Sequence, residues 1–171
     1  LLWLFAFVAL LLGGCSSPAG KEKQAKYVFF FIGDGMGVNQ VQGTEIYRAE
    51  LEGKMGIAPL LFTQFPYSTV AITNSATNRV TDSAAAGTAL ATGRKTKNSA
   101  IGVLKDQETP ISSVAVWAKN KGCRVGIATS VTVNHATPGA FYAHAAKRTL
   151  YHEIGKDLYK TGFDFYAGSD F

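Results

Sequence analysis

The sequence has few cysteines, no clusters of basic residues and no apolar run long enough to cross a bilayer comfortably. Of its two cysteines, Cys15 is assigned below to membrane attachment, and Cys123 alone forms neither an intramolecular disulfide nor a thiolate metal site. The lysines and arginines behind the net charge of +5 stand singly, so nucleic-acid binding is not expected. Ser83 lacks the Gly-x-Ser-x-Gly surroundings of serine esterases, which argues against a Ser-His-Asp triad.

An apolar run of twelve residues, Leu1 to Leu12, opens the chain. This length is typical of the central region of a secretory signal and short for a membrane-spanning helix. The run leads into Leu12-Gly13-Gly14-Cys15, which resembles the end of a bacterial lipoprotein signal, where the cysteine is lipidated and becomes the mature N-terminus. The alternative is a buried helix with an incidental cysteine. Because no Met or basic residue precedes Leu1, we expect the printed sequence to begin inside the signal.

These features predict three regions. They are a signal segment at 1–14, a tether at 15–25 that begins with the lipidated cysteine, and a folded domain at 26–171. The sequence therefore predicts an exported protein of the periplasm or cell envelope, anchored to a membrane through lipid on Cys15.

Apolar residues make up 47% of the chain and charged residues 17%, so a packed core is expected and disorder is not. Segments typical of strands alternate with segments typical of helices, which predicts an α/β fold. We expect a three-layer αβα sandwich with a mostly parallel central sheet. The last strand candidate ends three residues before residue 171, so we expect the domain to be incomplete at its C-terminus.

The expected elements follow from the local patterns. Strands are expected at 27–32, 69–72, 123–129 and 163–168. Helices are expected at 38–51, 81–92, 111–120 and 138–146, where Pro138 suits a first helical turn. Polar loops are expected at 93–98 and 131–135.

Two of these segments carry polar residues where chemistry is favoured. Asp34 lies between two glycines directly after the first expected strand, so the chain can turn sharply and present the carboxylate at the strand end. In the stretch 81–92, Asp82 precedes Ser83 at the expected start of an alanine-rich helix. A serine there lies among unpaired N–H groups at the positive end of the helix dipole, which favours a phosphate. A small-residue helix packed closely on a sheet is the simpler alternative.

A third polar cluster is His135-Ala136-Thr137. Because the carboxyl ends of parallel strands lie along one edge of a sheet, we expect it to converge with Asp34 and Asp82-Ser83. Arg148 follows Thr137 across an expected helix of about three turns, and we expect it to return to the same edge.

Three segments together resemble the alkaline phosphatase family, in order and in spacing. They are Phe31-Ile32-Gly33-Asp34-Gly35-Met36-Gly37, Thr81-Asp82-Ser83-Ala84-Ala85-Ala86-Gly87-Thr88-Ala89, and His135-Ala136-Thr137-Pro138 followed by Ala143-His144 and Arg148. The resemblance implies hydrolysis of phosphate monoesters through a phosphoserine, with two Zn²⁺ ions and a third metal, usually Mg²⁺. It also implies a homodimer.

By position, the resemblance implies that Ser83 is the nucleophile and that Arg148 binds two phosphate oxygens, as a planar guanidinium can. Asp82 would hold that guanidinium in place, although it can equally be no more than a helix cap. Because no His or Lys neighbours Ser83 in sequence, activation by a bound metal is expected. A solvated surface arginine is the alternative for Arg148.

The resemblance also implies metal ligands. Asp34 would bridge one zinc and the third metal, with Ser83 as a further ligand, unless Asp34 merely caps the next helix. His135 and Thr137 match the third-metal site. Because imidazole suits zinc better than magnesium, His135 leaves the identity of that metal open, and a loop histidine without a metal role is the alternative.

The other histidines, His144 and His152, match no family ligand and are assigned structural roles. The family's remaining zinc ligands lie well downstream of the arginine, so this segment alone is expected to be inactive. A phosphodiesterase of the same superfamily and a non-catalytic lipoprotein that binds phosphate or metal are the alternatives. A sulfatase is disfavoured because the residues after Ser83 lack the required proline and arginine.

Overall fold

A computed structural model describes residues 25–170 of the chain. The expected signal segment, the lipidation of Cys15 and the tether up to residue 24 lie outside the described residues. The chain divides into two units, one ending at Gly33 and the other beginning at Asp34. Across residues 25–170, no helix combines the length and the apolar character that crossing a membrane requires.

The first unit does not contain the strand expected at 27–32. Its aromatic side chains are largely exposed, from 55% for Phe30 to 88% for Phe31, and the rings of Phe29 and Phe31 stack with centroids 6.3 Å apart. None of residues 25–33 belongs to a β-ladder of the described chain. The strand prediction is wrong because apolar, β-prone residues supply only the propensity, whereas a strand also needs a hydrogen-bonded neighbour.

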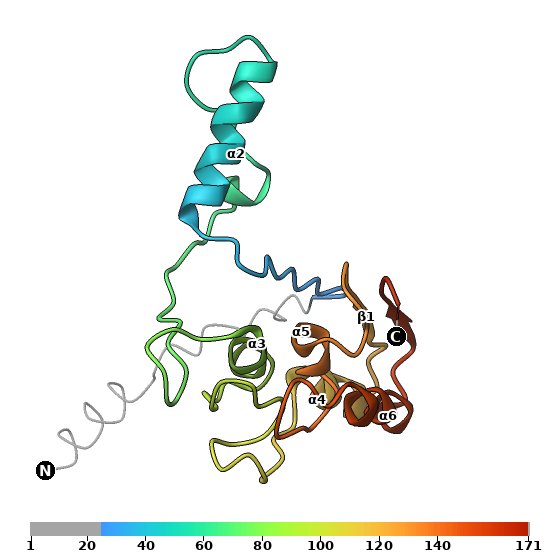
Figure 1. The fold of residues 1–171 in the computed structure, drawn as a ribbon. Helices are drawn as coiled ribbons and strands as arrows, with labels where there is room; N and C mark the ends of the chain where they lie inside the picture. Colours follow the sequence, from blue (N-terminus) through green and yellow to red (C-terminus); the bar gives the residue numbers. More distant parts are fainter. Residues whose placement is uncertain (1–24, 171) are drawn as a thin grey trace, which may run out of the picture. The chain divides into compact units, whose positions relative to one another are not determined.

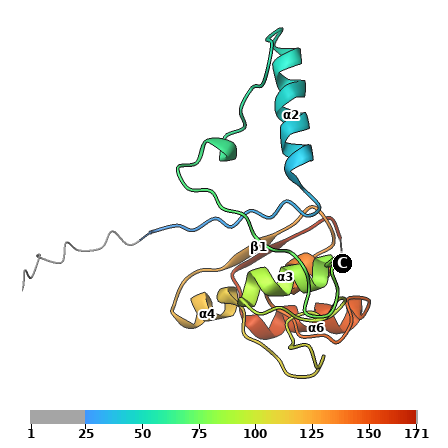
Figure 2. The same ribbon diagram turned by 90° about the vertical axis from the view of Figure 1, so that its left-hand side faces the viewer.

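The second unit begins with a turn containing Gly35, followed by helix α2 (Val38–Leu51), which has the expected bounds (Figures 1 and 2). The side chain of Glu45 is buried, and its carboxylate accepts hydrogen bonds from the Leu60 N–H at 2.9 Å and the Thr63 hydroxyl at 2.6 Å. These hydrogen bonds hold the pKa of Glu45 below its usual value. The segment after α2 is thereby tied to the helix.

The second expected strand, at 69–72, is also wrong. Between α2 and α3 the chain forms only the short 3₁₀ helix η1 (Phe62–Gln64), which ends before residue 69, and Val70 is 95% exposed. The ammonium of Lys95 donates to the carbonyl oxygens of Ile72 and Asn74, at 3.0 and 2.6 Å. The Lys95 side chain therefore donates to backbone carbonyl oxygens that would accept hydrogen bonds from a neighbouring strand in a sheet.

Helix α3 (Ser83–Thr92) confirms the helix expected in the stretch 81–92, and it contributes Ala84 and Ala91 to the hydrophobic core. It packs closely on the short helix α5 (Ala136–Gly139) (Figure 1). A Cβ atom added to Gly87 would lie 3.1 Å from the Cβ of Ala140. The small residues of α3 thus permit a close contact with a helix, where the simpler interpretation of this stretch expects contact with a sheet.

The sheet of the described residues consists of β1 (Gly126–Ala128) and β2 (Phe165–Ala167), which pair in parallel with Ile127 opposite Tyr166. This pairing and the surrounding helices confirm the α/β class, with shorter strands than expected. Strand β1 begins late because the N–H of Cys123 still bonds to the carbonyl of Ala118 in the preceding helix.

That preceding helix is α4 (Val114–Asn120), which begins three residues after the expected start at 111. Ser113 sets the start, since its Oγ accepts a hydrogen bond from the Val116 N–H at 3.1 Å and caps the helix. Near the other end, Lys119 contacts the carboxylate of Asp164 at 2.7 Å, directly before β2. This hydrogen bond lowers the pKa of Asp164 and ties α4 to the sheet.

The helix expected at 138–146 is wrong beyond its first turn. Helix α5 ends at Gly139, and Ala145 forms an antiparallel bridge with Ile101 through two hydrogen bonds of 2.9 Å. These bonds to a distant segment replace the i to i−4 bonds that would continue the helix. The chain therefore reaches Arg148 through a turn and a bridge, and not across three helical turns.

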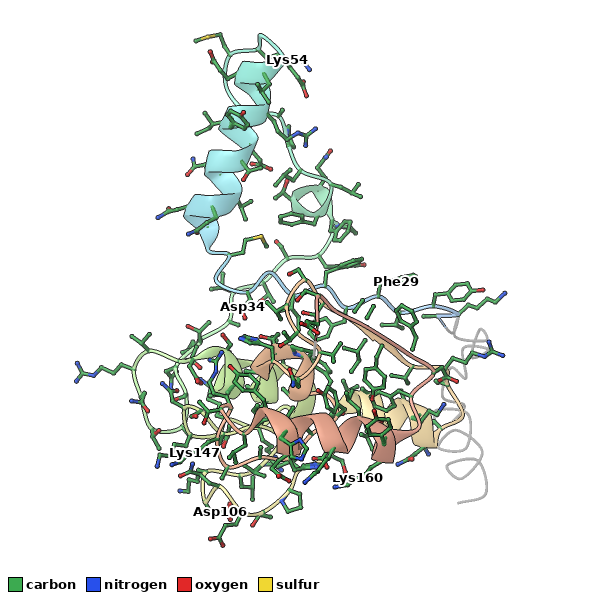
Figure 3. All side chains as sticks on the ribbon, turned by 45° about the vertical axis from the view of Figure 1, so that its right-hand side comes forward. Phe29, Asp34, Lys54, Asp106, Lys147 and Lys160 are labelled. Carbon is green, nitrogen blue, oxygen red and sulfur yellow. The ribbon has the colours of Figure 1, made fainter. Side chains whose placement is uncertain are left out.

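Helix α6 (Tyr151–Thr161) is not among the elements expected from the sequence. Ile154 and Leu158, one turn apart, are its buried residues. Oppositely charged side chains on α6 also form ion pairs, such as the contact of 2.6 Å between Asp157 and Lys160. Lys160 is labelled in Figure 3. An apolar i, i+4 pair with charged pairs at helical spacing is a helix signal that was present in the sequence.

Gly102 is a position where a side chain does not fit. Its φ is +58°, and an added Cβ would lie 2.1 Å from the carbonyl oxygen of Ala143. Two hydrogen bonds hold the backbone of Gly102 in place. Its N–H donates to the Thr88 hydroxyl, and its carbonyl oxygen accepts from the Ile111 N–H.

We expect Gly102→Ala to destabilise the protein by at least about 2 kcal/mol, because the left-handed backbone and the clash with a carbonyl add together. Gly43→Ala is the matched control, since it lies inside α2 with open space around it. It should be neutral or stabilise by up to about 1 kcal/mol. Urea unfolding of both variants measures the difference, and equal stability of the two would contradict the packing described for Gly102.

Candidate functional site

Ser83 is the first residue of α3, and its position is fixed by the residue before it. The Asp82 side chain caps the helix by accepting a hydrogen bond from the Ala85 N–H at 3.0 Å. Ser83 is half-buried, and it lies among the first N–H groups of the helix, where the helix dipole is positive. This is a favourable place for an anion.

Asp34, labelled in Figure 3, lies beside this helix start. One carboxylate oxygen accepts a hydrogen bond from the Ser83 hydroxyl at 3.4 Å, and the other accepts one from the Thr137 hydroxyl at 2.8 Å. The contact with Thr137 is firm, whereas the one with Ser83 is at the long end of the hydrogen-bond range. Residues 103 positions apart in sequence thus meet.

Arg148 lies next to Asp82. Its Nη1 is 3.3 Å from Oδ2 of Asp82, and both side chains are 25% exposed. The same Oδ2 accepts the Ser99 N–H at 3.0 Å, and the Ser99 hydroxyl accepts the Arg148 N–H at 3.3 Å. Ser99 is a contact of this site that no pattern in the sequence indicated.

His135 contacts Arg148, with Nε2 of the ring 3.2 Å from Nη2 of the guanidinium. A guanidinium can only donate, so Nε2 accepts and the ring proton is on Nδ1. Nδ1 is buried and has no hydrogen-bond partner among residues 25–170. His135 is therefore oriented by the arginine, whereas Thr137, two residues later, is oriented by Asp34.

A buried tyrosine fixes the loop that carries His135. The hydroxyl of Tyr142 donates to the carbonyl of Val133 at 2.6 Å. Burial raises the pKa of Tyr142 well above its usual value, so the hydroxyl keeps its proton and remains a donor. The loop therefore has a fixed anchor two residues before His135.

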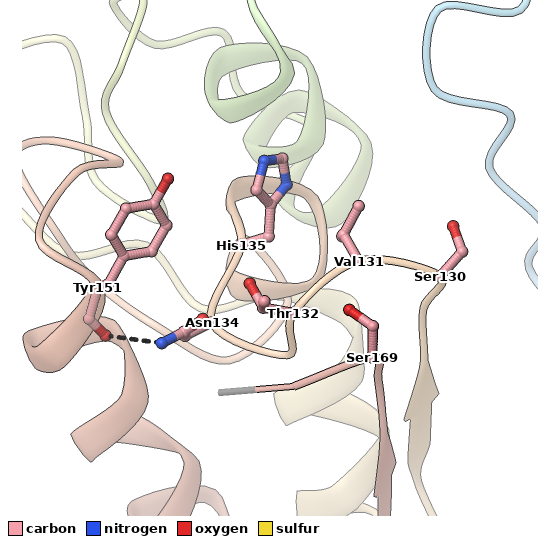
Figure 4. Close-up of a pocket in the computed structure, with 7 residues that line it drawn as sticks. All are labelled: Ser130, Val131, Thr132, Asn134, His135, Tyr151 and Ser169. Carbon is pink, nitrogen blue, oxygen red and sulfur yellow. Dashed lines mark hydrogen bonds between the residues drawn. The ribbon is translucent and has the colours of Figure 1, made fainter.

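His135 also lines a pocket of about 580 Å³ at the ends of β1 and β2 (Figure 4). The other lining residues are Ser130, Val131, Thr132, Asn134, Tyr151 and Ser169. In Figure 4 the imidazole of His135 and the hydroxyl end of Tyr151 extend to the same side of the pocket. The pocket therefore adjoins the pair of His135 and Arg148.

The donor set around Asp34 suits a hard cation. It combines a carboxylate with the hydroxyls of Ser83 and Thr137, and Mg²⁺ prefers such oxygen ligands. Zinc sites usually draw three or more protein ligands from His, Cys, Asp and Glu. Within the part of the chain that the structure describes, no three such side chains gather at one point. Asp34 can thus contribute to a metal centre, but the described residues do not complete one for zinc.

The fold and the site define an α/β protein in which a serine at a helix start meets a carboxylate, while an arginine is held by the helix cap. The family model described as alkaline phosphatase matches residues 25–163. The chain belongs to the alkaline phosphatase family.

Individual relatives agree. The chain is 38% identical over 142 residues to the tissue-nonspecific alkaline phosphatase of Gallus gallus. The matched region covers 76% of this chain and 27% of that protein. Among solved structures, it is similar to a cold-active alkaline phosphatase from Shewanella sp., with a TM-score of 0.71, 35% identity, and coverage of 78% of this chain and 33% of that one.

A third match is a variant of the alkaline phosphatase from the Antarctic bacterium TAB5, in which a histidine is replaced by glutamate and magnesium is bound in the M3 site. The TM-score is 0.67, with 33% identity and coverage of 78% of this chain and 36% of that one. The chain spans about a quarter to a third of the curated relatives it matches.

The contacts of Asp82 predict how two substitutions differ. Asp82→Ala removes the helix cap and both contacts of Oδ2, and we expect it to destabilise the protein by about 1 to 2 kcal/mol. Asp82→Asn keeps one oxygen that can cap the helix, so it should lower the free energy of unfolding by less than Asp82→Ala does. Thermal unfolding of the two variants tests this, and equal losses would show that the cap oxygen contributes nothing.

Proposed function

We propose that the whole protein hydrolyses phosphate monoesters through a phosphoserine formed on Ser83. The observation that carries the proposal is the position of the Ser83 hydroxyl at the start of α3, next to Asp34 and one residue from the carboxylate that holds Arg148. Family membership supports the same reaction.

In the first step, the Ser83 oxygen forms a bond to phosphorus as the bond from phosphorus to the leaving oxygen breaks. The Ser83 hydroxyl gives up its proton to solvent and the leaving oxygen takes up one in return, so the leaving group departs as an alcohol or phenol and the phosphoryl group remains on Ser83. In the second step, water attacks phosphorus as the bond from phosphorus to the serine oxygen breaks; one water proton ends on the serine oxygen, which restores the hydroxyl, and inorganic phosphate leaves. The N–H groups at the start of α3 stabilise the phosphoryl charge in both steps.

Arg148 would bind two phosphoryl oxygens through its planar N–H groups. Its contacts with Asp82 and His135 restrict the guanidinium before substrate arrives. A guanidinium that is already oriented loses less conformational entropy on binding, which improves positioning of the reacting groups. Asp82 thus combines a structural role at the helix start with orientation of the arginine.

The metal content proposed is two Zn²⁺ ions and one Mg²⁺ or other divalent ion. Asp34 would bridge two of these positions, with Ser83 as a ligand on one side and Thr137 on the other. When bound, such ions lower the pKa of the serine hydroxyl and neutralise phosphoryl charge. Nε2 of His135 contacts Arg148 and Nδ1 carries the proton, so a metal role for the imidazole requires the ring to leave its contact with Arg148.

The remaining parts of the proposal concern the cell and the assembly. We place residues 1–14 in a signal, residues 15–25 in a tether lipidated at Cys15, and residues 26–171 in the N-terminal part of the phosphatase domain. The protein would be exported to the cell envelope and form homodimers. Palmitate labelling of the wild type and of Cys15→Ala tests the anchor.

Trapping of phosphoserine tests the reaction itself. The full-length protein is incubated with an aryl phosphate, quenched at low pH, digested and analysed by mass spectrometry. A phosphorylated peptide containing Ser83 supports the mechanism. Phosphate binding without a covalent adduct would instead favour a non-catalytic binding lipoprotein, and faster turnover of diesters than of monoesters would favour a phosphodiesterase.

A further inference from the structure

Ser99 has a backbone conformation that is uncommon for a residue with a side chain. Its φ is +76°, and Ser99 and Gln107 are the non-glycine residues with positive φ among those described. A Cβ atom makes the left-handed region unfavourable, so such a residue persists only where its surroundings determine it strongly. The contacts of Ser99 show what determines it.

Both backbone and side chain of Ser99 contact the arginine site. Its N–H donates to Oδ2 of Asp82 at 3.0 Å, and its Oγ accepts the backbone N–H of Arg148 at 3.3 Å. The Arg148 guanidinium returns to the same Oδ2 at 3.3 Å. The three residues, from three separate segments, therefore close a ring of contacts.

The segment before Ser99 is itself fixed to the residues that lead into α3. The Asn98 side chain donates to the Val80 carbonyl at 3.0 Å, and the Thr96 carbonyl accepts the Ala76 N–H at 2.9 Å. These contacts hold Ser99 against the start of the helix that carries Asp82. Movement of Ser99 relative to Asp82 is thus restricted from both directions.

We infer that Ser99 is a positioning residue, whose left-handed turn and hydroxyl set the distance between the Asp82 carboxylate and Arg148. In combination with the proposed function, it acts on phosphate through Arg148 and does not touch the substrate. The left-handed backbone directs the N–H toward Asp82 while Oγ faces Arg148. A serine is needed because glycine would adopt the turn without supplying the hydroxyl.

Two substitutions separate this role from a purely structural one. Ser99→Gly relieves the backbone strain and removes the hydroxyl, so its thermal midpoint should stay or rise. Ser99→Thr keeps the hydroxyl but adds a β-branch in an unfavourable conformation, so its midpoint should fall. If Ser99 has only a structural role, phosphate binding should weaken in the less stable variant, Ser99→Thr. If Ser99 positions Arg148, phosphate binding should weaken in the variant that lacks the hydroxyl, Ser99→Gly.

The test measures the inhibition constant of inorganic phosphate in the full-length protein. In Ser99→Gly it should rise about 3- to 10-fold, the value of one lost hydrogen bond, with little change in kcat. In Ser99→Thr it should stay within about 2-fold of the wild type, despite the lower midpoint. Ser112→Gly, the same change at an exposed serine, is the control and should leave the constant unchanged.

Crystal structures of the two variants provide a readout that does not depend on activity. The guanidinium of Arg148 should leave Asp82 in Ser99→Gly and remain there in Ser99→Thr. An unchanged inhibition constant in Ser99→Gly would overturn the inference about Ser99. A wild type that binds no phosphate would overturn the proposed function instead, and the Arg148 position in the crystal structures would then decide the role of Ser99.

Discussion

Replacing Ser83 by alanine is expected to reduce phosphate release by the full-length protein by roughly 10⁴-fold or more. In the proposed mechanism the Ser83 oxygen bonds to phosphorus, so loss of this nucleophile would remove the covalent route as a whole. The substitution should be structurally mild, because alanine is a good helix former and Asp82 still caps α3. Release of an aryl leaving group at alkaline pH measures the effect.

Ser112→Ala is the control for this prediction, since it makes the same change at an exposed serine directly before the capping Ser113 of α4. It should keep wild-type turnover. Phosphoserine trapping gives a second readout, because the Ser83→Ala protein should show no labelled peptide. Turnover near the wild-type rate in Ser83→Ala would remove Ser83 from the role proposed for it.

Arg148→Lys is expected to reduce kcat/KM for a phosphate monoester by about 10²-fold. A lysine keeps the charge, but its ammonium cannot donate two parallel N–H groups to two phosphoryl oxygens. It also cannot contact Asp82 and His135 simultaneously through a planar group, as the guanidinium does. The expected loss combines weaker phosphate binding with poorer orientation.

Arg79→Lys is the matched control, because Arg79 is exposed. It should leave kcat/KM unchanged. Measuring KM and kcat separately distinguishes weaker ground-state binding from loss of transition-state stabilisation. If Arg148→Lys behaves like Arg79→Lys, the arginine does not bind the phosphoryl group.

Local sequence signals predicted the parts of the fold whose structure depends on neighbouring residues. Helix α2 has the expected bounds, and α3 begins where a capping aspartate precedes a run of alanines. Helix α4 begins three residues after the expected start because Ser113 caps it. Helix α6 also has a local signal, since Ile154 and Leu158 lie at helical spacing, although no helix is expected there above.

The errors concern segments whose structure depends on distant partners. The apolar residues at 27–32 have strand propensity but form no ladder within the described residues. The segment after α5 forms a bridge with Ile101 in place of a helix. In the first case no neighbouring strand pairs with the segment among the described residues, and in the second a contact remote in sequence replaces the helix.

Residue identities and spacings were enough to indicate the family, the order of the candidate site residues and the helix start that presents Ser83. They were enough because ordered motifs and helix caps depend on residue identity and short spacings. Three contacts follow from the folded chain alone: Asp34 with Thr137, His135 with Arg148, and Ser99 with both Asp82 and the arginine. These contacts join residues far apart in the chain, and packing of the whole fold fixes the distances between them.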